Sequence, residues 1–214
     1  MQHRKNLRVL VARHGQSVWN GTNRISGQLD PDLSQKGLRQ SRALARILRT
    51  ERLDEIYTST LRRTVTTAQP TADMHGLKIR SYEALKEIDF GELQGRYRDQ
   101  RDPAAMRMWQ LREQDKLHYH PPAGESFVQL ENRVIACLRE ILAIRSQRLI
   151  LIVGHRSTNR VIIGALMGWP RERWAAINPR ARYLCEITQS DSPSINSIAL
   201  TGETAGTRHA GYCM

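Results

Sequence analysis

Two histidines follow two strongly apolar stretches of the chain, and imidazole is a side chain that acts as nucleophile, acid or base near neutral pH. His14 comes shortly after residues 7–12, and His155 comes shortly after residues 149–153. Both stretches are short and continuous, which is typical of strands buried on both faces in a parallel sheet. Ligands of such sheets bind beyond the carboxyl ends of the strands. If the two strands are neighbours, we expect the two imidazoles to converge on one site.

The residues around His14 make this signal more specific than an isolated histidine would be. Residues 7–20 read LRVLVARHGQSVWN, which resembles the strand-to-loop junction of the histidine phosphatase superfamily. That superfamily includes the cofactor-dependent phosphoglycerate mutases and many small-molecule phosphatases. Four further segments resemble its motifs in the expected order: STLRRTVTTA at 59–68, LKEIDFGELQG at 85–95, PAGES at 122–126 and LILIVGH at 149–155.

The resemblance implies a metal-independent phosphomonoesterase that acts on a small phosphorylated metabolite. It implies a phosphohistidine intermediate on His14, a general acid and base at Glu87, and a second catalytic histidine at His155. It assigns the substrate phosphate to four residues: Arg13, Asn20, Arg63 and His155. The resemblance implies no metal and no cofactor.

Residue chemistry agrees with this assignment. A phosphoryl group brings roughly two negative charges and three oxygens that need donors. The guanidinium groups of Arg13 and Arg63 are suited to paired contacts with such oxygens, and they stabilise charge in the transferring group. To attack phosphorus with a neutral ring nitrogen, His14 needs its other nitrogen held by a backbone carbonyl, which we expect near Gly15.

Several carboxylates compete with Glu87 for the proton-transfer role. Glu83, Asp89 and Glu92 lie close by, and residue chemistry alone does not choose among the four. Only the resemblance points to Glu87.

One departure from the family pattern lies next to the second histidine. Family members usually carry glycine at that position, whereas this chain has Arg156. Our hypothesis is that Arg156 grips a second anionic group of the substrate, such as a carboxylate, or adds to the phosphate clamp. The alternative is a surface arginine that begins a helix. Ser26 and Gly27 are the other candidates for substrate specificity.

Alternation of strands and helices predicts an α/β fold, a three-layer α/β/α sandwich with a mostly parallel central sheet. We expect a single domain over 1–214, with a small helical lid insertion at about 96–122 and a disordered tail at about 203–214. Strands are expected at 7–12, 55–58, 77–81, 149–153, 183–188 and 195–200. Helices are expected at 34–49, 61–74, 127–143 and 159–167, with Ser34 and Gly76 as caps.

Composition places the chain among globular proteins of the cytoplasm. The sequence has 214 residues, 40% hydrophobic, and no apolar run long enough for a membrane span. The charged start and the short apolar run after it do not fit a signal peptide. Cys137, Cys185 and Cys213 are scattered, which is typical of reduced thiols. A homodimer is compatible with the sequence.

The formal net charge of +12 indicates attraction to an anionic partner. A small phosphate ester and a nucleic acid both satisfy it, but no recognisable nucleic-acid motif is present. The two alternatives to a phosphatase are therefore a cofactor-dependent phosphoglycerate mutase and, with less support, a nucleic-acid-binding protein. The short insertion and the apolar Ile88 and Phe90 beside the expected acid favour hydrolysis over the mutase.

Overall fold

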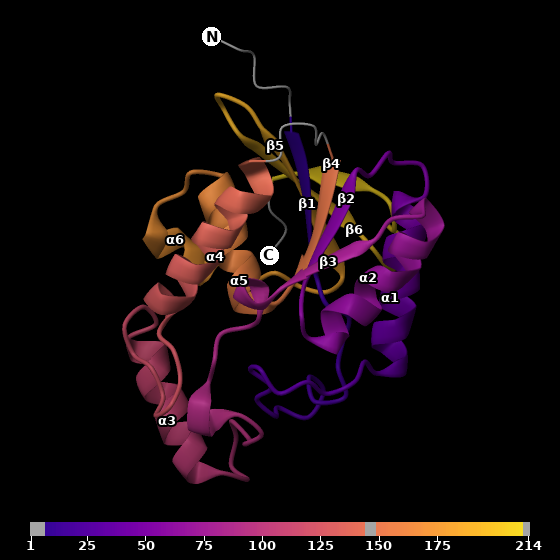
Figure 1. Cartoon of the computed structure of the whole chain (residues 1–214). Coiled ribbons are helices and arrows are strands. Elements are labelled where there is room, and N and C mark those ends of the chain that lie inside the picture. The colour runs from indigo at the N-terminus through magenta and orange to yellow at the C-terminus, as the bar shows by residue number, and fades with distance from the viewer. Residues whose placement is uncertain (1–6, 144–148, 212–214) are drawn as a thin grey trace.

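The computed structural model describes residues 7–143 and 149–211, and its strands form one mixed sheet (Figure 1). The strands are β1 (Leu7–Arg13), β2 (Glu55–Ser59), β3 (Ile79–Tyr82), β4 (Leu149–Gly154), β5 (Tyr183–Gln189), β6 (Ser194–Ala199) and β7 (Arg208–Ala210). Their order is β3-β2-β4-β1-β5-β6-β7. The strands from β3 to β1 are parallel, and β5, β6 and β7 continue the sheet in antiparallel pairs.

Helices cover both faces of this sheet, as the predicted three-layer fold requires. The helices α1 (Gln35–Leu48) and α2 (Arg62–His75) lie on one face, and α4 (Phe127–Ala143), α5 (Arg156–Leu166) and α6 (Arg171–Ala176) lie on the other (Figure 1). The helix α3 (Pro103–Gln114) lies apart from both layers, within the expected lid insertion. Two 3-10 turns, η1 (Glu83–Leu85) and η2 (Gly91–Leu93), lead into that segment. Among the described residues, no helix is long and apolar enough to span a membrane.

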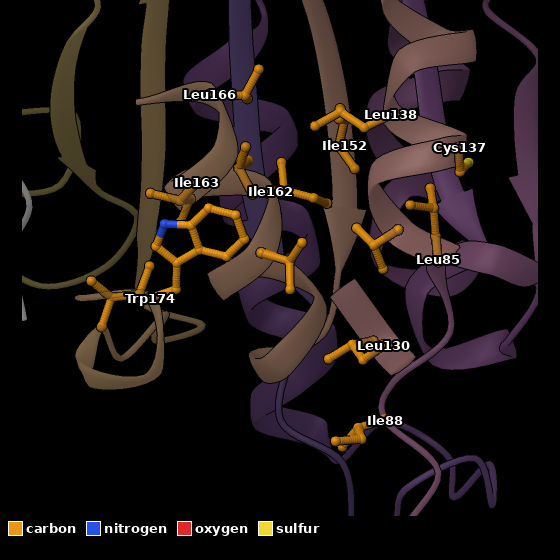
Figure 2. Packing of buried hydrophobic residues seen from close by; sticks show 14 of the residues in the cluster. Leu85, Ile88, Leu130, Cys137, Leu138, Ile152, Ile162, Ile163, Leu166 and Trp174 are labelled. Atoms are coloured by element: carbon orange, nitrogen blue, oxygen red, sulfur yellow. The ribbon is translucent and has the colours of Figure 1, made fainter. Parts of the chain in front are cut away.

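Alternate residues of the central strands supply two separate cores. Val9 and Val11 of β1 belong to a cluster with side chains of α4 and α5, whereas Leu10 and Ala12 pack with Leu44 of α1. Figure 2 shows the first cluster, with labelled side chains from β4, α4, α5 and α6. Because both faces are covered, β1 and β4 carry apolar residues almost continuously, as strands of parallel sheets do.

The pairing of β1 with β4 confirms that the two histidine-bearing strands are neighbours. They run parallel, and Arg13 is in register with Gly154. His14 and His155 are the next residues, so both emerge at the same edge of the sheet. The chain after β1 and the segment that carries α3 both lie beyond this edge (Figure 1).

Local signals fixed several helix ends correctly. Ser34 precedes α1, and its hydroxyl accepts a hydrogen bond from the amide of Gly37 at 3.2 Å. Gly76 ends α2 in the left-handed region, with φ of 63°. In contrast, α5 begins at Arg156 and not at the expected 159. The sequence did not reveal this start because His155, which precedes the helix, makes no side-chain capping hydrogen bond.

The structure differs from expectation in the C-terminal tail. Residues 208–210, which we expected to lack order, form β7 against β6. Glu186 on β5 is buried and accepts from Arg208 Nε at 2.7 Å and from Arg8 Nε at 2.8 Å. This ion-pair cluster joins residues far apart in sequence, so the tail's Gly- and Thr-rich composition gave no sign of it. Residues 212–214, with Cys213, lie outside the described part.

Two glycines allow the loop after β1 to approach α1 closely. A methyl group on Gly15 would lie 2.6 Å from the carbonyl oxygen of Gly37, closer than carbon and oxygen pack. The loop that bears His14 therefore depends on a missing side chain at the next position.

Gly15→Ala should lower the free energy of unfolding by about 1–3 kcal/mol, because the backbone of Gly37 cannot move aside without shifting α1. Gly21→Ala is the matched control, since nothing lies within 4 Å of the added methyl group there. Urea unfolding of the two variants measures the difference. Equal stabilities would show that the close approach carries no energetic weight.

Candidate active site

His14 is buried, and its ring is fixed by the chain itself. Its amide donates to the carbonyl of Gly154 at 2.9 Å, and its Nδ1 lies 2.7 Å from the carbonyl oxygen of Gly15. A carbonyl only accepts, so Nδ1 carries the hydrogen and Nε2 keeps a lone pair. The expected backbone carbonyl is thus the one belonging to Gly15. This arrangement leaves Nε2 available as a nucleophile.

His155 lies beside His14, as the strand pairing requires. The two ring centroids are 5.2 Å apart and the planes are inclined at 58°. His155 Nε2 lies 2.7 Å from the hydroxyl of Ser59, which also contacts Thr64. Its Nδ1 is buried and has no hydrogen-bond partner among the described residues. If the Ser59 hydroxyl donates to Nε2, the hydrogen of His155 is on Nδ1, where it can be donated to an anion; the other tautomer would donate from Nε2 to Ser59.

The two arginines of the proposed phosphate clamp differ in how many hydrogen bonds their guanidinium groups already make within the protein. Arg13 makes one long contact, from Nη1 to the carbonyl of Pro179 at 3.4 Å, and its Nε is unpaired. Arg63 donates from Nη1 to the carbonyl of Leu29 and to the carboxylate of Asp30, and from Nη2 to the carbonyl of Gly27. Only its Nε is unpaired. Arg63 has five N–H groups and these contacts engage three of them, so its Nε–H and one Nη2–H remain available to an anion while the others hold the 27–30 loop in place.

Glu87 is the carboxylate that reaches the site. It is buried, and it accepts from the amide of Ile88 at 2.9 Å and from the amide of Ser157 at 3.1 Å. The competing carboxylates point elsewhere: Glu83 pairs with Lys86 and Thr60, Asp89 caps the amide of Gly91, and Glu92 is exposed. Of the four candidate carboxylates, the structure places Glu87 at the cavity.

An arginine that the sequence reasoning missed supports the Glu87 segment. Arg133 on α4 donates to the carbonyls of Ala84, Lys86 and Glu87 at 2.8, 2.9 and 3.0 Å. Glu125 holds this guanidinium through contacts at 3.1 and 2.6 Å. The PAGES segment thus contributes by fixing Arg133, which positions Glu87. Ser59 was also missed, although it ends a strand at the same sheet edge as both histidines.

A cavity of about 180 Å³ brings most candidate residues together. It is lined by all of the predicted site residues except His155, namely Arg13, His14, Asn20, Ser26, Gly27, Arg63, Glu87 and Arg156. Asn20 is exposed, and its side-chain oxygen accepts from the amide of Ser17 at 2.9 Å. Its Nδ2 is therefore turned away from that contact. Unforeseen members of the lining come from the lid and from α5: Arg98, Trp109, Arg112, Lys116 and Arg160.

Unpaired polar atoms gather around this cavity. Eight buried side-chain atoms lack a partner among the described residues, and five of them belong to site residues: Arg13 Nε, Ser26 Oγ, Arg63 Nε, His155 Nδ1 and Arg156 Nε. Three of these five are guanidinium N–H groups, which can only donate. Buried donors are normally satisfied, so their concentration here indicates a site built for an anion.

Among the described residues, no group of three or more His, Cys, Asp and Glu side chains is arranged to hold a metal ion. The lid residue His118 is exposed, and its amide and ring hydrogen-bond with Asp115.

Burial and neighbouring charge keep both histidines neutral. Burial, followed by the charges of Arg63 and Arg13, lowers the pKa of His14 well below 6.5. Burial and the charge of Arg63 also lower the pKa of His155 well below 6.5. Burial lowers the pKa of Arg13 to about 10, so that guanidinium stays charged at neutral pH.

Stability of the unliganded protein should therefore fall as the pH drops below about 6.5. There the unfolded chain protonates both imidazoles while the folded chain does not, so each contributes a slope of up to about 1.4 kcal/mol per pH unit. His14→Gln should reduce the slope, as measured by urea unfolding between pH 7.5 and 5.5. His118→Gln, at an exposed position, is the control. An unchanged slope in His14→Gln would contradict the neutral buried ring.

Comparison with known proteins agrees with this geometry. The chain matches the histidine phosphatase superfamily (branch 1) over residues 9–195. It is 33% identical over 165 residues to phosphoserine phosphatase 1 of Hydrogenobacter thermophilus, covering 76% of this chain and 77% of that protein. It is 30% identical over 202 residues to a probable phosphoglycerate mutase of Yersinia pestis, covering 93% and 94% of the two chains.

Solved structures show the same fold. A mycobacterial glucosyl-3-phosphoglycerate phosphatase in complex with VO3 superposes with a TM-score of 0.75 at 27% identity, covering 88% of this chain and 97% of that one. An alpha-ribazole phosphatase from Shigella flexneri reaches a TM-score of 0.81 at 22% identity, covering 97% and 100%. The chain therefore belongs to branch 1 of the histidine phosphatase superfamily, as an enzyme of the phosphatase type.

Proposed function

We propose that this enzyme hydrolyses a small phosphate monoester, without a metal ion, through a phosphohistidine on His14. The observation that carries the proposal is the set of unpaired buried donors around a neutral His14 whose Nε2 keeps its lone pair. In this proposal Arg13, Arg63, His155 and Asn20 bind the phosphoryl oxygens. These donors stabilise charge that develops on the transferring group.

In the first step His14 Nε2 attacks phosphorus, and a P–N bond forms as the ester P–O bond breaks. The electron pair of the broken bond goes to the leaving oxygen, which takes a proton from the carboxyl group of Glu87. Among the residues that the structure describes, Glu87 Oε2 accepts one hydrogen bond, at 3.3 Å from the amide of Ser157. This oxygen is therefore the one best placed to hold the transferred proton.

In the second step the Glu87 carboxylate takes a proton from water as the water oxygen attacks phosphorus. The P–N bond breaks, its electron pair returns to His14 Nε2, and inorganic phosphate leaves. The hydrogen bond from Nδ1 to Gly15 keeps the ring orientation through both steps. Arg133 acts as a positioning residue, since it holds the backbone carbonyl of Glu87.

His14→Ala should lower the rate of phosphate release from p-nitrophenyl phosphate by a factor of about 10³ or more, as expected for loss of a nucleophile. Wild type should retain its activity in EDTA and should trap an acid-labile, alkali-stable phosphoryl group in rapid-quench labelling. His118→Ala is the control, since it removes an exposed lid histidine. Persistent activity in His14→Ala, or loss of wild-type activity in EDTA, would contradict the proposal.

Glu87→Gln tests the proton donor. Its kcat/KM should fall by about 10²–10⁴-fold for an alkyl phosphate. The fall should be smaller for p-nitrophenyl phosphate, because p-nitrophenolate leaves without a proton. Glu92→Gln, an exposed carboxylate of the same segment, is the matched control. Equal losses on both substrates would assign Glu87 a role other than protonating the leaving group.

A phosphoglycerate mutase is the second candidate, favoured by the relative that matches over 93% of the chain. A mutase must retain its phosphoryl group and return it to the bound intermediate instead of to water. Isomerisation of 3-phosphoglycerate without release of phosphate would identify it. Phosphate release that keeps pace with substrate loss supports the hydrolase.

Substrate choice and cellular location complete the proposal. We assign specificity to Ser26, Gly27 and Arg156, because all three line the cavity beside the phosphoryl-binding residues. We place the enzyme in the cytoplasm. Cys137 and Cys185 are buried in the apolar cores, which suits thiols kept reduced in that compartment.

A further inference from the structure

The cavity carries more positive charge than one phosphoryl group needs. Apart from the residues already assigned to the phosphoryl group, its lining includes five cations from the lid and α5: Arg98, Arg112, Lys116, Arg156 and Arg160. Only two carboxylates share the lining, Glu87 and Glu113. With Glu87 assigned to proton transfer, Glu113 is the remaining carboxylate of the lining, and it forms ion pairs with Arg112 and Lys116.

Aromatic rings, more than carboxylates, hold the two lid arginines. The guanidinium of Arg98 lies 5.5 Å from the ring centre of Trp109. Arg112 is buried and lies 5.2 Å from the ring centres of both Trp109 and Phe90. Its nearest carboxylate is Glu113, at 3.5 Å. A cation held over a ring face keeps its N–H donors for another partner.

The two arginines of α5 are similarly uncommitted. They stand one helical turn apart, so they share a face. Arg156 Nε is buried without a partner, and Arg160 donates Nε to the carbonyl of Ile177 at 2.6 Å. Within the described residues, Arg98, Arg156 and Arg160 form no ion pair with a carboxylate. Three guanidinium groups beside one cavity therefore have no ion-pair partner in the described part of the chain, and only the more distant carboxylate charges of Glu87, Asp99 and Glu113 act on Arg98 and Arg160.

These cations repel one another. After burial, the charge of Arg156 is the largest cause that lowers the pKa of Arg98 and of Arg160, the latter to about 10. Arg156 also lowers the pKa of the Arg112 guanidinium. Like charges held together in a partly buried cavity are costly unless an anion joins them.

We propose that Arg98, Arg112, Arg156 and Arg160 form a distal anion subsite that takes a second phosphoryl group of the substrate. The inference rests on the proposed function, since it names the class of ester that the same cavity accepts: a bisphosphorylated small molecule. A second phosphoryl group brings roughly two charges and three acceptor oxygens. That matches several uncommitted guanidinium groups better than a carboxylate, which brings one charge and two oxygens.

The test measures binding to His14→Ala, so that turnover does not consume the ligand. Isothermal titration at 150 mM KCl compares three families of unbranched three- to six-carbon probes. These are monoalkyl phosphates, ω-phosphooxy carboxylates and α,ω-alkanediol bisphosphates. The subsite predicts that the best bisphosphate binds at least 10-fold more tightly than the monophosphate of equal length, and more tightly than the matching carboxylate.

Further variants in the His14→Ala background distinguish the effect of charge at the subsite from the effect of the protein's overall charge. Arg156→Gln and Arg98→Gln should each reduce the preference for the bisphosphate at least fivefold. Arg139→Gln removes one charge at an exposed site on α4 outside the cavity, so it should leave the preference unchanged. Thermal melts establish that each variant is folded. Because Arg98 and Arg156 lie on different elements, a folding defect in one leaves the other as a test.

Each outcome decides the inference. A bisphosphate that binds no better than the monophosphate or the carboxylate overturns it, as does an equal effect of Arg139→Gln and Arg156→Gln. Failure of the proposed function is a separate result: wild type would release no phosphate from p-nitrophenyl phosphate, whatever the titrations show. Turnover without a bisphosphate preference removes the subsite and leaves the phosphatase.

Discussion

Parallel pairing of β1 with β4 is the constraint on which the rest of the site depends. The register that sets Arg13 opposite Gly154 delivers His14 and His155 to one sheet edge, where their rings come within 5.2 Å between centroids. Both strands are buried on both faces. A register slip of one residue would move each side chain to the opposite face of the sheet, and the packing of both helix layers would be lost. The packing of the two cores therefore fixes the relative position of His14 and His155 as well as the fold.

The electrostatics of the site follow from what surrounds those two rings. Burial and nearby guanidinium groups lower the pKa of His14, which keeps its Nε2 unprotonated and nucleophilic. In the proposed mechanism the same guanidinium groups bind the phosphate, so one arrangement of charge would both prepare the nucleophile and bind the substrate. The proposed mechanism assigns proton transfer to Glu87, which is held at the start of α5 by the amide of Ser157.

A layer of supporting contacts gives these groups their positions. Both terminal nitrogens of Arg63 donate hydrogen bonds to the loop from Gly27 to Asp30. Arg133, held by Glu125, donates to the backbone of the Glu87 segment. Ser59 orients His155. Beyond this layer, the lid and α5 line the cavity with cations, to which our proposal assigns substrate selection.

The sequence by itself determined the α/β fold, most strand and helix positions, and the candidate residues His14, Arg13, Arg63, Glu87 and His155, because apolar periodicity and short motifs are local properties. Only the tertiary structure showed that Glu87 lies at the cavity while its three acidic neighbours lie outside the lining, that Arg63 binds the 27–30 loop, and that Arg208 pairs with Glu186. Only the fold also gathered Arg98, Arg112 and Arg160 around Arg156. The physical reason is that hydrogen bonds and charge interactions act over a few ångströms in space, and the partners they join here lie tens of residues apart along the chain.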